Sequence, residues 1–176
     1  MGFDFVVLGA TGLQGKIASR YLLENGYSVL LCGRYRGRVK ALLGRYIKSG
    51  FGRIDLGNID KTIDIIKNSR ADIVLNCAEG DWNLNTLKAC VNANANCLDL
   101  GSEIWMTKKQ LKMHFILKEK NLIHITGCGS VPGIGNVMLR YASEKFKKIE
   151  TIEVGFAWNS NIKKFVVPFS IQSIIE

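Results

Sequence analysis

Proline and histidine are scarce in this chain of 176 residues, and its cysteines follow no pattern. There are two prolines, two histidines and five cysteines, and no two cysteines have the C-x-x-C spacing of a metal site or redox motif. A zinc site is therefore not expected, and reduced thiols are the simplest interpretation of the odd cysteine count. With so little proline there is no Pro-rich linker, and the chain has no repeat or low-complexity run.

Long apolar runs are also missing from the chain. No stretch reaches the ~18 residues that a membrane helix needs, and neither a basic flank nor a cleavage site follows Met1. These absences predict a cytoplasmic protein with no membrane partner. Because hydrophobic residues make up 47% of the chain and charged residues 22%, a globular domain with a buried core is expected.

Acidic residues are rare in the first third of the chain, where positive charge gathers. Residues 1–53 carry nine Lys or Arg against two acids, and residues 25–54 contain no acid at all. Residues 54–176 are nearly neutral, with fifteen bases and thirteen acids. Such a local surplus is typical of a nucleic-acid surface or of a phosphate pocket. Interleaved aromatic residues are lacking, so a nucleic-acid partner is not expected.

Apolar strand-like runs and helical segments alternate along the chain. In the first helix, expected at 13–24, Leu13, Ile17, Tyr21 and either Leu22 or Ala18 share one face. Because parallel strands need helical crossovers, the alternation predicts an α/β fold with a Rossmann-type doubly wound parallel sheet, in the order 3-2-1-4-5-6. The strands are expected at 4–8, 27–32, 51–55, 72–76, 97–100 and 122–126, with a seventh at 149–157. The helices are expected at 13–24, 39–47, 59–68, 82–92, 105–120 and 135–146.

The predicted dinucleotide-binding domain covers residues 1–150, and the remaining tail does not fit its pattern. The tail, residues 151–176, includes an apolar stretch that contains Pro168. We expect it to begin a second domain, for substrate binding or dimerisation, that is incomplete here. Exposed apolar residues in this tail favour a homo-oligomer, although a missing partner domain would leave the same signature.

A glycine-rich loop joins the first predicted strand to the first predicted helix. In this position a G-x-x-G-x-x-G loop is the fingerprint of a dinucleotide site. The first glycine permits a tight turn, the second lets backbone N–H groups approach a pyrophosphate, and the third lets the helix pack closely. The start of the helix offers unpaired N–H donors to the phosphates. The loop residues are Gly9, Ala10, Thr11, Gly12, Leu13, Gln14 and Gly15.

The end of the second strand indicates which dinucleotide is bound. NAD-binding proteins usually place Asp or Glu there to hold the ribose 2′-hydroxyl. This chain has Gly33, Arg34 and Arg36 instead, and Arg38 follows. A guanidinium group can hold a 2′-phosphate with two hydrogen bonds, whereas a carboxylate would repel it. We therefore predict NADP rather than NAD, with Arg34 as the main ligand and Arg36 or Arg38 assisting; the alternative is that these arginines are merely solvated.

Residues that follow the next two strands are expected to complete the cofactor site, because ligands bind at the carboxyl ends of parallel strands. Asp55 follows the third strand and is expected near the adenine. Asn76, Cys77 and Ala78 follow the fourth strand and are expected near the ribose on the nicotinamide side. Each of them has an alternative interpretation as an ordinary loop residue.

Two thiols are the candidates for catalysis. Cys77 and Cys128 each follow a predicted strand, and a thiol at this edge could relay a proton. Burial as small apolar side chains is the alternative interpretation for both. The loops at 101–102 and 127–133 are expected at the same edge of the sheet.

Five segments occur in an order and at spacings that resemble the N-terminal NAD(P)-binding domain of the saccharopine dehydrogenase-like oxidoreductases. They are GATGLQG, CGR, DIVLNCA, CLDLGSE and GCGSVPGIGN, and the resemblance covers residues 3–158. Residues 166–176 resemble the start of that family's second domain. The resemblance implies an NADP-dependent oxidoreductase that transfers a hydride at the C–N bond of a small-molecule amino acid or imine. The alternative function is that of a truncated, non-catalytic NADP-binding module.

Two positions depart from the saccharopine reductases of this family. Val131 stands before Pro-Gly where those enzymes usually carry an Asp, and residues 155–158 replace a Cys-Gly-Gly-type segment. Both departures remove an ionisable group, which argues against saccharopine itself as the substrate. An apolar residue before Pro-Gly is closer to the lysine dehydrogenase branch of the family.

Overall fold

The computed structural model describes residues 2–101 and 103–155 and confirms the predicted architecture. Six parallel strands form one sheet in the order β3-β2-β1-β4-β5-β6. The strands are β1 (Phe5–Leu8), β2 (Val29–Gly33), β3 (Ser49–Arg53), β4 (Ile73–Asn76), β5 (Asn96–Asp99) and β6 (His124–Ile125).

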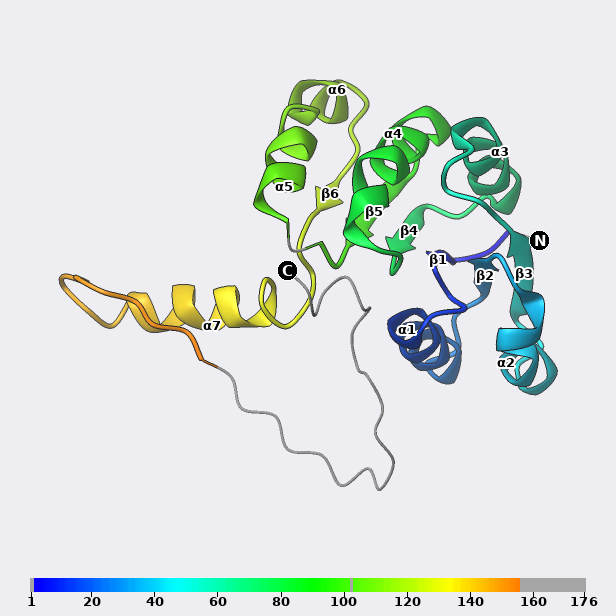
Figure 1. Ribbon diagram of the computed structural model, residues 1–176, viewed down its shortest axis with the longest axis horizontal. Coiled ribbons are helices and arrows are strands. Elements are labelled where there is room, and N and C mark those ends of the chain that lie inside the picture. The colour runs from blue at the N-terminus through cyan, green and yellow to red at the C-terminus, as the bar shows by residue number, and fades with distance from the viewer. Residues whose placement is uncertain (1, 102, 156–176) are drawn as a thin grey trace.

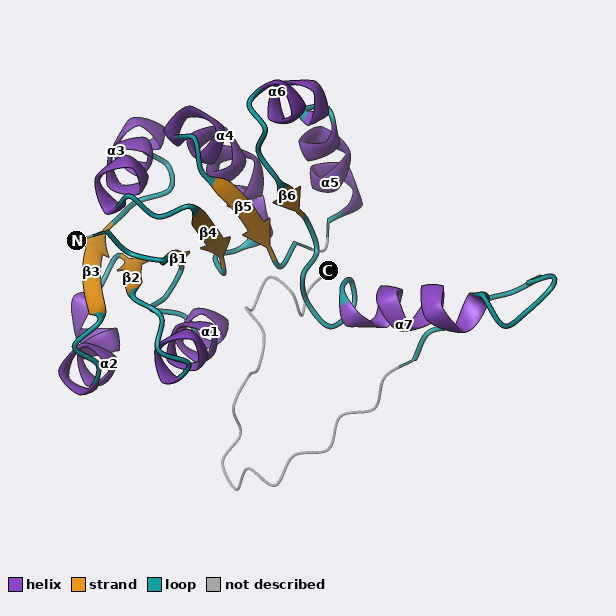
Figure 2. Ribbon diagram, turned by 180° about the vertical axis from the view of Figure 1, so that it is seen from behind, coloured by secondary structure: helices purple, strands orange, loops and turns teal. Residues whose placement is uncertain are grey.

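Helices cover both faces of this sheet, as the alternating pattern predicts. Helices α1 and α2 lie on one face, and α3, α4, α5 and α6 lie on the other (Figure 1; Figure 2 gives the view from behind). The helices are α1 (Leu13–Glu24), α2 (Lys40–Arg45), α3 (Ile59–Ser69), α4 (Asn83–Ala93), α5 (Ile104–Leu111), α6 (His114–Glu119) and α7 (Ile134–Ser143). Two short 3₁₀ turns precede α2 and α4, at Arg36–Val39 and Gly80–Trp82. Within the described residues no helix is both long and apolar enough to span a bilayer.

The central strands are apolar on both faces because helices bury both. Val6 and Leu8 belong to the cluster on the α3 and α4 side, whereas Val7 and Leu31 belong to the cluster on the α1 and α2 side. All four side chains are fully buried. This arrangement explains why the strands read as continuous apolar runs rather than as alternating ones.

Helix α1 lies with a different face toward the sheet than its apolar spacing suggests. Its buried residues are Gly15, Ser19 and Leu23. Most of the predicted apolar face is exposed instead: Leu13, Ile17 and Tyr21 are 47%, 53% and 66% accessible, while Leu22 is half-buried against the core. Small residues face the sheet because the start of the helix lies directly against the strand ends, where larger side chains would not fit.

Two other expectations differ from the structure. The helix expected at 105–120 is divided into α5 and α6 at Met113, whose side chain packs against the core. Residues 149–155, the described part of the expected seventh strand, form no strand. Helix α7 leads the chain away from β6, so this segment does not return to the sheet edge (Figure 1). The rest of the predicted second domain, residues 156–176, lies outside the described residues.

Helix α7 has no buried residue, although its sequence is amphipathic. Ile134, Val137, Met138 and Tyr141 are all more than half exposed. Exposed apolar surface of this kind is typical of an interaction face. The self-association predicted from the apolar tail stays a prediction.

A pair of glycine substitutions tests the close packing of α1. A Cβ atom at Gly15 would collide with the backbone of Gly9 and Ala10, whereas one at Gly44 in α2 meets no atom within 4 Å. Gly15→Ala should therefore lower the free energy of unfolding by about 1–3 kcal/mol. Gly44→Ala should raise it by about 0.5–1 kcal/mol, because alanine favours the helix. Urea denaturation measures both values, and two changes of equal sign and size would contradict the packing.

Candidate functional site

The glycine-rich loop is held between the ends of three strands. Gly9 leaves β1 in the left-handed region, with a φ of 74°. The N–H of Ala10 donates to the carbonyl of Cys32 at the end of β2, at 2.9 Å. The N–H of Cys77, just past β4, donates to the carbonyl of Leu8, also at 2.9 Å. A Cβ atom on Gly9 would collide with the backbone that follows β4, so only glycine fits this turn.

The first turn of α1 is open to an anion. Helix α1 starts after Gly12, which supplies no side-chain cap, and its first turn contains no acid. Gly12, Leu13 and Gln14 are exposed, while Thr11 is half-buried. The free N–H groups and the positive end of the helix dipole therefore face an accessible edge of the sheet, which is the arrangement that binds phosphate.

The end of β2 lies against this loop. A Cβ atom on Gly33 would meet the side chain of Thr11, so the absence of a side chain at Gly33 lets the two segments touch. Arg34 follows directly and is exposed. The structure thus brings together the two parts of the predicted cofactor site, the glycine-rich loop and the arginine segment.

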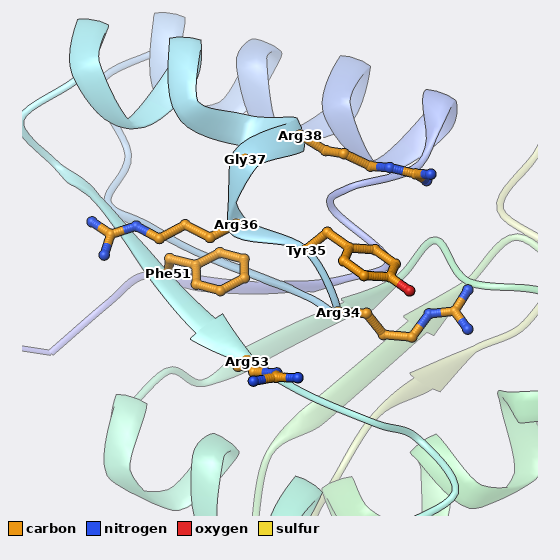
Figure 3. Close-up of a pocket in the computed structure, with 7 residues that line it drawn as sticks. All are labelled: Arg34, Tyr35, Arg36, Gly37, Arg38, Phe51 and Arg53. Atoms are coloured by element: carbon orange, nitrogen blue, oxygen red, sulfur yellow. The ribbon is translucent and has the colours of Figure 1, made fainter.

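An open pocket of about 650 Å³ lies beside the arginine segment. Arg34 and Arg38 both extend past the ring of Tyr35, and their guanidinium carbons lie 5.9 and 5.4 Å from the ring centre (Figure 3). Arg36 points the opposite way, beside Phe51 (Figure 3). The arrangement favours Arg38 over Arg36 as the partner of Arg34. The pocket is lined by Arg34, Tyr35, Arg36, Gly37, Arg38, Phe51 and Arg53.

Besides Gly37, three residues of this pocket were not predicted as site residues. Tyr35, Phe51 and Arg53 line it together with the predicted arginines. Strand β3 ends at Arg53, two residues earlier than expected, so Arg53 lies at the carboxyl ends of the strands. None of the pocket arginines forms an ion pair with a described residue, which leaves their charge available to an anion. The basic surplus of residues 1–53 was the sequence signal for Arg53.

Asn76 and Asp55 hold their own loops. Asn76 is fully buried; its amide donates to Asn83 Oδ1 at 2.7 Å, and its Oδ1 accepts the N–H of Ala78 at 3.1 Å. Asp55 is exposed and accepts the N–H of Gly57 at 3.1 Å. Each side chain therefore holds the backbone of its own loop, and the cofactor contacts predicted for Asn76 and Asp55 stay predictions.

The two candidate thiols have different surroundings. Burial raises the pKa of half-buried Cys77 to about 12. Cys128 is exposed, and its Sγ lies 3.5 Å from the carbonyl oxygen of Ile125. Partial burial, together with the negative charge of Asp99, raises the pKa of Cys128 as well. Both side chains are therefore thiols, not thiolates, at neutral pH, and each can hold a proton. No cluster of three His, Cys, Asp or Glu residues suited to a metal occurs in the described part of the chain.

Comparison with known proteins agrees with this geometry. Residues 5–125, more than half of the chain, match a family model described as the saccharopine dehydrogenase NADP-binding domain. No curated protein matches the sequence.

The chain is similar in fold to several solved structures of low sequence identity. Saccharopine dehydrogenase (L-Glu forming) from Saccharomyces cerevisiae is 13% identical with a TM-score of 0.69, and the alignment covers 82% of this chain and 31% of that one. A short-chain dehydrogenase/reductase from Vibrio parahaemolyticus is 14% identical, with a TM-score of 0.59 and coverage of 69% and 76%. UDP-glucose 4-epimerase from Thermotoga maritima is 12% identical, with a TM-score of 0.54 and coverage of 69% and 53%. The chain therefore spans about a third of the yeast enzyme's length.

Alkylation of the cysteines tests their different surroundings. Iodoacetamide should modify Cys128 in the native protein, and Cys77 only after unfolding, because Cys77 is shielded and its pKa is about 12. The raised pKa of Cys128 means that its thiolate forms at higher pH, so its rate should still be rising above the usual thiol pKa of about 8.5. Mass spectrometry of digested samples identifies the modified residue, with Cys128→Ser as the control. Rapid native labelling of Cys77 at neutral pH would contradict this account.

Proposed function

Since the chain belongs to the saccharopine dehydrogenase NADP-binding domain family, we propose that it binds the cofactor of an oxidoreductase acting at the C–N bond of an amino acid or imine. The observation that carries the proposal is the contact between Thr11 and Gly33, which joins the helix start to the arginine segment. If the pyrophosphate of the cofactor binds at the start of α1, its adenosine ribose would thus lie within reach of two guanidinium groups.

The residues present fit NADP in a definite orientation. The backbone N–H groups of Leu13 and Gln14 would hold the pyrophosphate, because the first turn of α1 has no competing cap, whereas the N–H of Gly12 already donates to the Gly9 carbonyl. Arg34 and Arg38 would hold the 2′-phosphate, because both side chains extend in the same direction past the Tyr35 ring, away from Arg36. The backbone after β4 would then support the ribose on the nicotinamide side.

The chemistry divides between the cofactor and the protein. When bound, NADP(H) supplies or accepts the hydride, and the protein provides orientation and a proton. Reduction of an imine adds a hydride to carbon and a proton to nitrogen, so a proton donor is needed near the C=N bond. Cys128 is the better suited of the two predicted thiols: it is exposed, and its raised pKa keeps the proton in place.

Arginine substitutions test how the cofactor is selected. Arg34→Ala should reduce the preference for NADPH over NADH by about 1–3 kcal/mol, the size of a charge-assisted hydrogen bond. Arg38→Ala should have a smaller effect in the same direction. Arg36→Ala is the matched control, because it removes the same charge from a side chain that points away. Fluorescence titrations with both nucleotides provide the affinities. Equal losses for all three variants would indicate a general effect of charge and would refute the assigned roles.

A turnover assay separates an enzyme from a binding module. The chain is mixed with NADP and, in turn, with single amino acids that include lysine, and formation of NADPH is followed by absorbance. NADPH formation that depends on the amino acid is expected for the proposed oxidoreductase. NADPH binding without turnover would instead support the non-catalytic module.

A further inference from the structure

Asp99, the last residue of β5, ties together the loops that follow β5 and β6. Its side chain is 1% exposed. Its Oδ1 accepts the N–H of Gly101 at 2.9 Å, the N–H of Gly127 at 3.1 Å and the hydroxyl of Thr126 at 3.2 Å. Its backbone oxygen accepts the N–H of Cys128 at 2.7 Å. One residue therefore fixes three backbone N–H groups on two separate loops.

The second carboxylate oxygen is held from the opposite side. Asp99 Oδ2 accepts a hydrogen bond from Gln110 Nε2 in α5 at 2.7 Å and lies 3.4 Å from His124 Nε2. The Thr126 hydroxyl also lies 3.3 Å from Gln110 Oε1, which closes the network. Among the described residues, no Lys or Arg forms an ion pair with Asp99. Hydrogen bonds, mostly from backbone and amide groups, thus offset the cost of burying this carboxylate.

Both side-chain oxygens of Asp99 must act as hydrogen-bond acceptors. The N–H groups of Gly101 and Gly127 converge on Oδ1, and the Gln110 amide donates to Oδ2. An ionised carboxylate only accepts, so it satisfies all of these donors, whereas an asparagine would turn one acceptor into an NH₂ group. That NH₂ group would face the Gln110 NH₂ group, or the Gln110 amide would have to rotate and disturb its contact with Thr126.

The neighbouring strand uses a similar but smaller device. Asn76 is the register partner of Asp99, and each of the two side chains accepts the N–H two residues ahead. The backbone contacts of the Asn76 side chain stay within its own loop, at Ala78, whereas Asp99 also reaches the loop after β6. Of these two side chains, Asp99 therefore joins two loops. It does so at the β5 and β6 side of the sheet, away from the arginine pocket at β2 and β3.

We propose that Asp99 is a positioning residue for the nicotinamide half of NADP(H), acting through the backbone at Gly101 and at Gly127–Cys128. This inference rests on the proposed function, in which the adenosine half lies at the ends of β2 and β3. Asp99 makes no hydrogen bond to that region, so its loss should affect the two halves of the cofactor unequally. Asp99 is not proposed as a catalytic residue, because it is buried; it orients the segment that carries Cys128.

Binding of two ligands to the whole chain tests this inference. NADPH contains both halves of the cofactor, whereas 2′,5′-ADP contains only the adenosine half with its 2′-phosphate. Asp99→Asn should weaken NADPH binding about tenfold or more, as expected when several hydrogen bonds are disturbed, and change 2′,5′-ADP binding less than about twofold. Ile66→Val, which trims a buried core residue in α3, controls for a loss of stability alone.

Protection of Cys128 provides a second readout that does not depend on turnover. NADPH should slow alkylation of Cys128 in the wild-type chain, and 2′,5′-ADP should not, because only NADPH reaches this loop. In Asp99→Asn the protection by NADPH should be lost. Thr86→Val is the matched control, because its buried hydroxyl on α4 has no hydrogen-bond partner among the described residues and lies outside the network.

The possible outcomes distinguish a failure of the role assigned to Asp99 from a failure of the proposed function. Equal weakening of NADPH and 2′,5′-ADP by Asp99→Asn would mean a purely structural role and would overturn the inference. If Asp99→Asn does not fold, Thr126→Val removes one hydroxyl from the same network, and the same unequal effect, smaller in size, is expected. A wild-type chain that binds neither ligand would overturn the proposed function itself. A wild-type chain that binds both ligands equally tightly would overturn only the role assigned to the β5 and β6 loops.

Discussion

The close approach of helix α1 to the strand ends is the constraint on which the rest of the structure depends. Gly9 and Gly15 must lack a side chain, because each lies against backbone, and a side chain at Gly33 would displace that of Thr11. This approach presents the open first turn of α1 at the same edge as the arginine segment. A methyl group at Gly9 or Gly15 would push the helix or the loop away. Steric exclusion, rather than attraction between charges, thus determines how the phosphate-binding loop and the arginine segment are placed.

The same constraint explains the exposed surface of α1. Because Gly15 and Ser19 face the sheet, little apolar area is buried beneath the first half of the helix. The larger apolar side chains, such as Ile17 and Tyr21, are left on the outer face. Helix stability is therefore reduced in favour of close backbone contact, and the apolar outer face remains available to another surface.

The sequence was sufficient for features that depend on local pattern. The six strands, their order and the glycine-rich loop follow from apolar runs, the alternation of strands with helices and the glycine spacing, and all agree with the structure. Features that depend on three-dimensional neighbours were not predictable. The opposite directions of Arg36 and Arg38 are set by their places in a short 3₁₀ turn. The role of Asp99 depends on Gln110 and on residues near 127, whose approach no local pattern encodes.

The two ends of the sheet edge recognise a ligand by different physics. At β2 and β3 the arginines are exposed and carry net charge, so their attraction for a phosphate is long-ranged and weakened by salt. At β5 and β6 the charge of Asp99 is buried and already satisfied, so it attracts no ligand itself but keeps two loops in one arrangement. On the proposed function, the first end captures the cofactor and the second fixes where its reactive ring comes to rest. Hydride transfer depends steeply on that distance, so the buried end has the stricter geometric requirement.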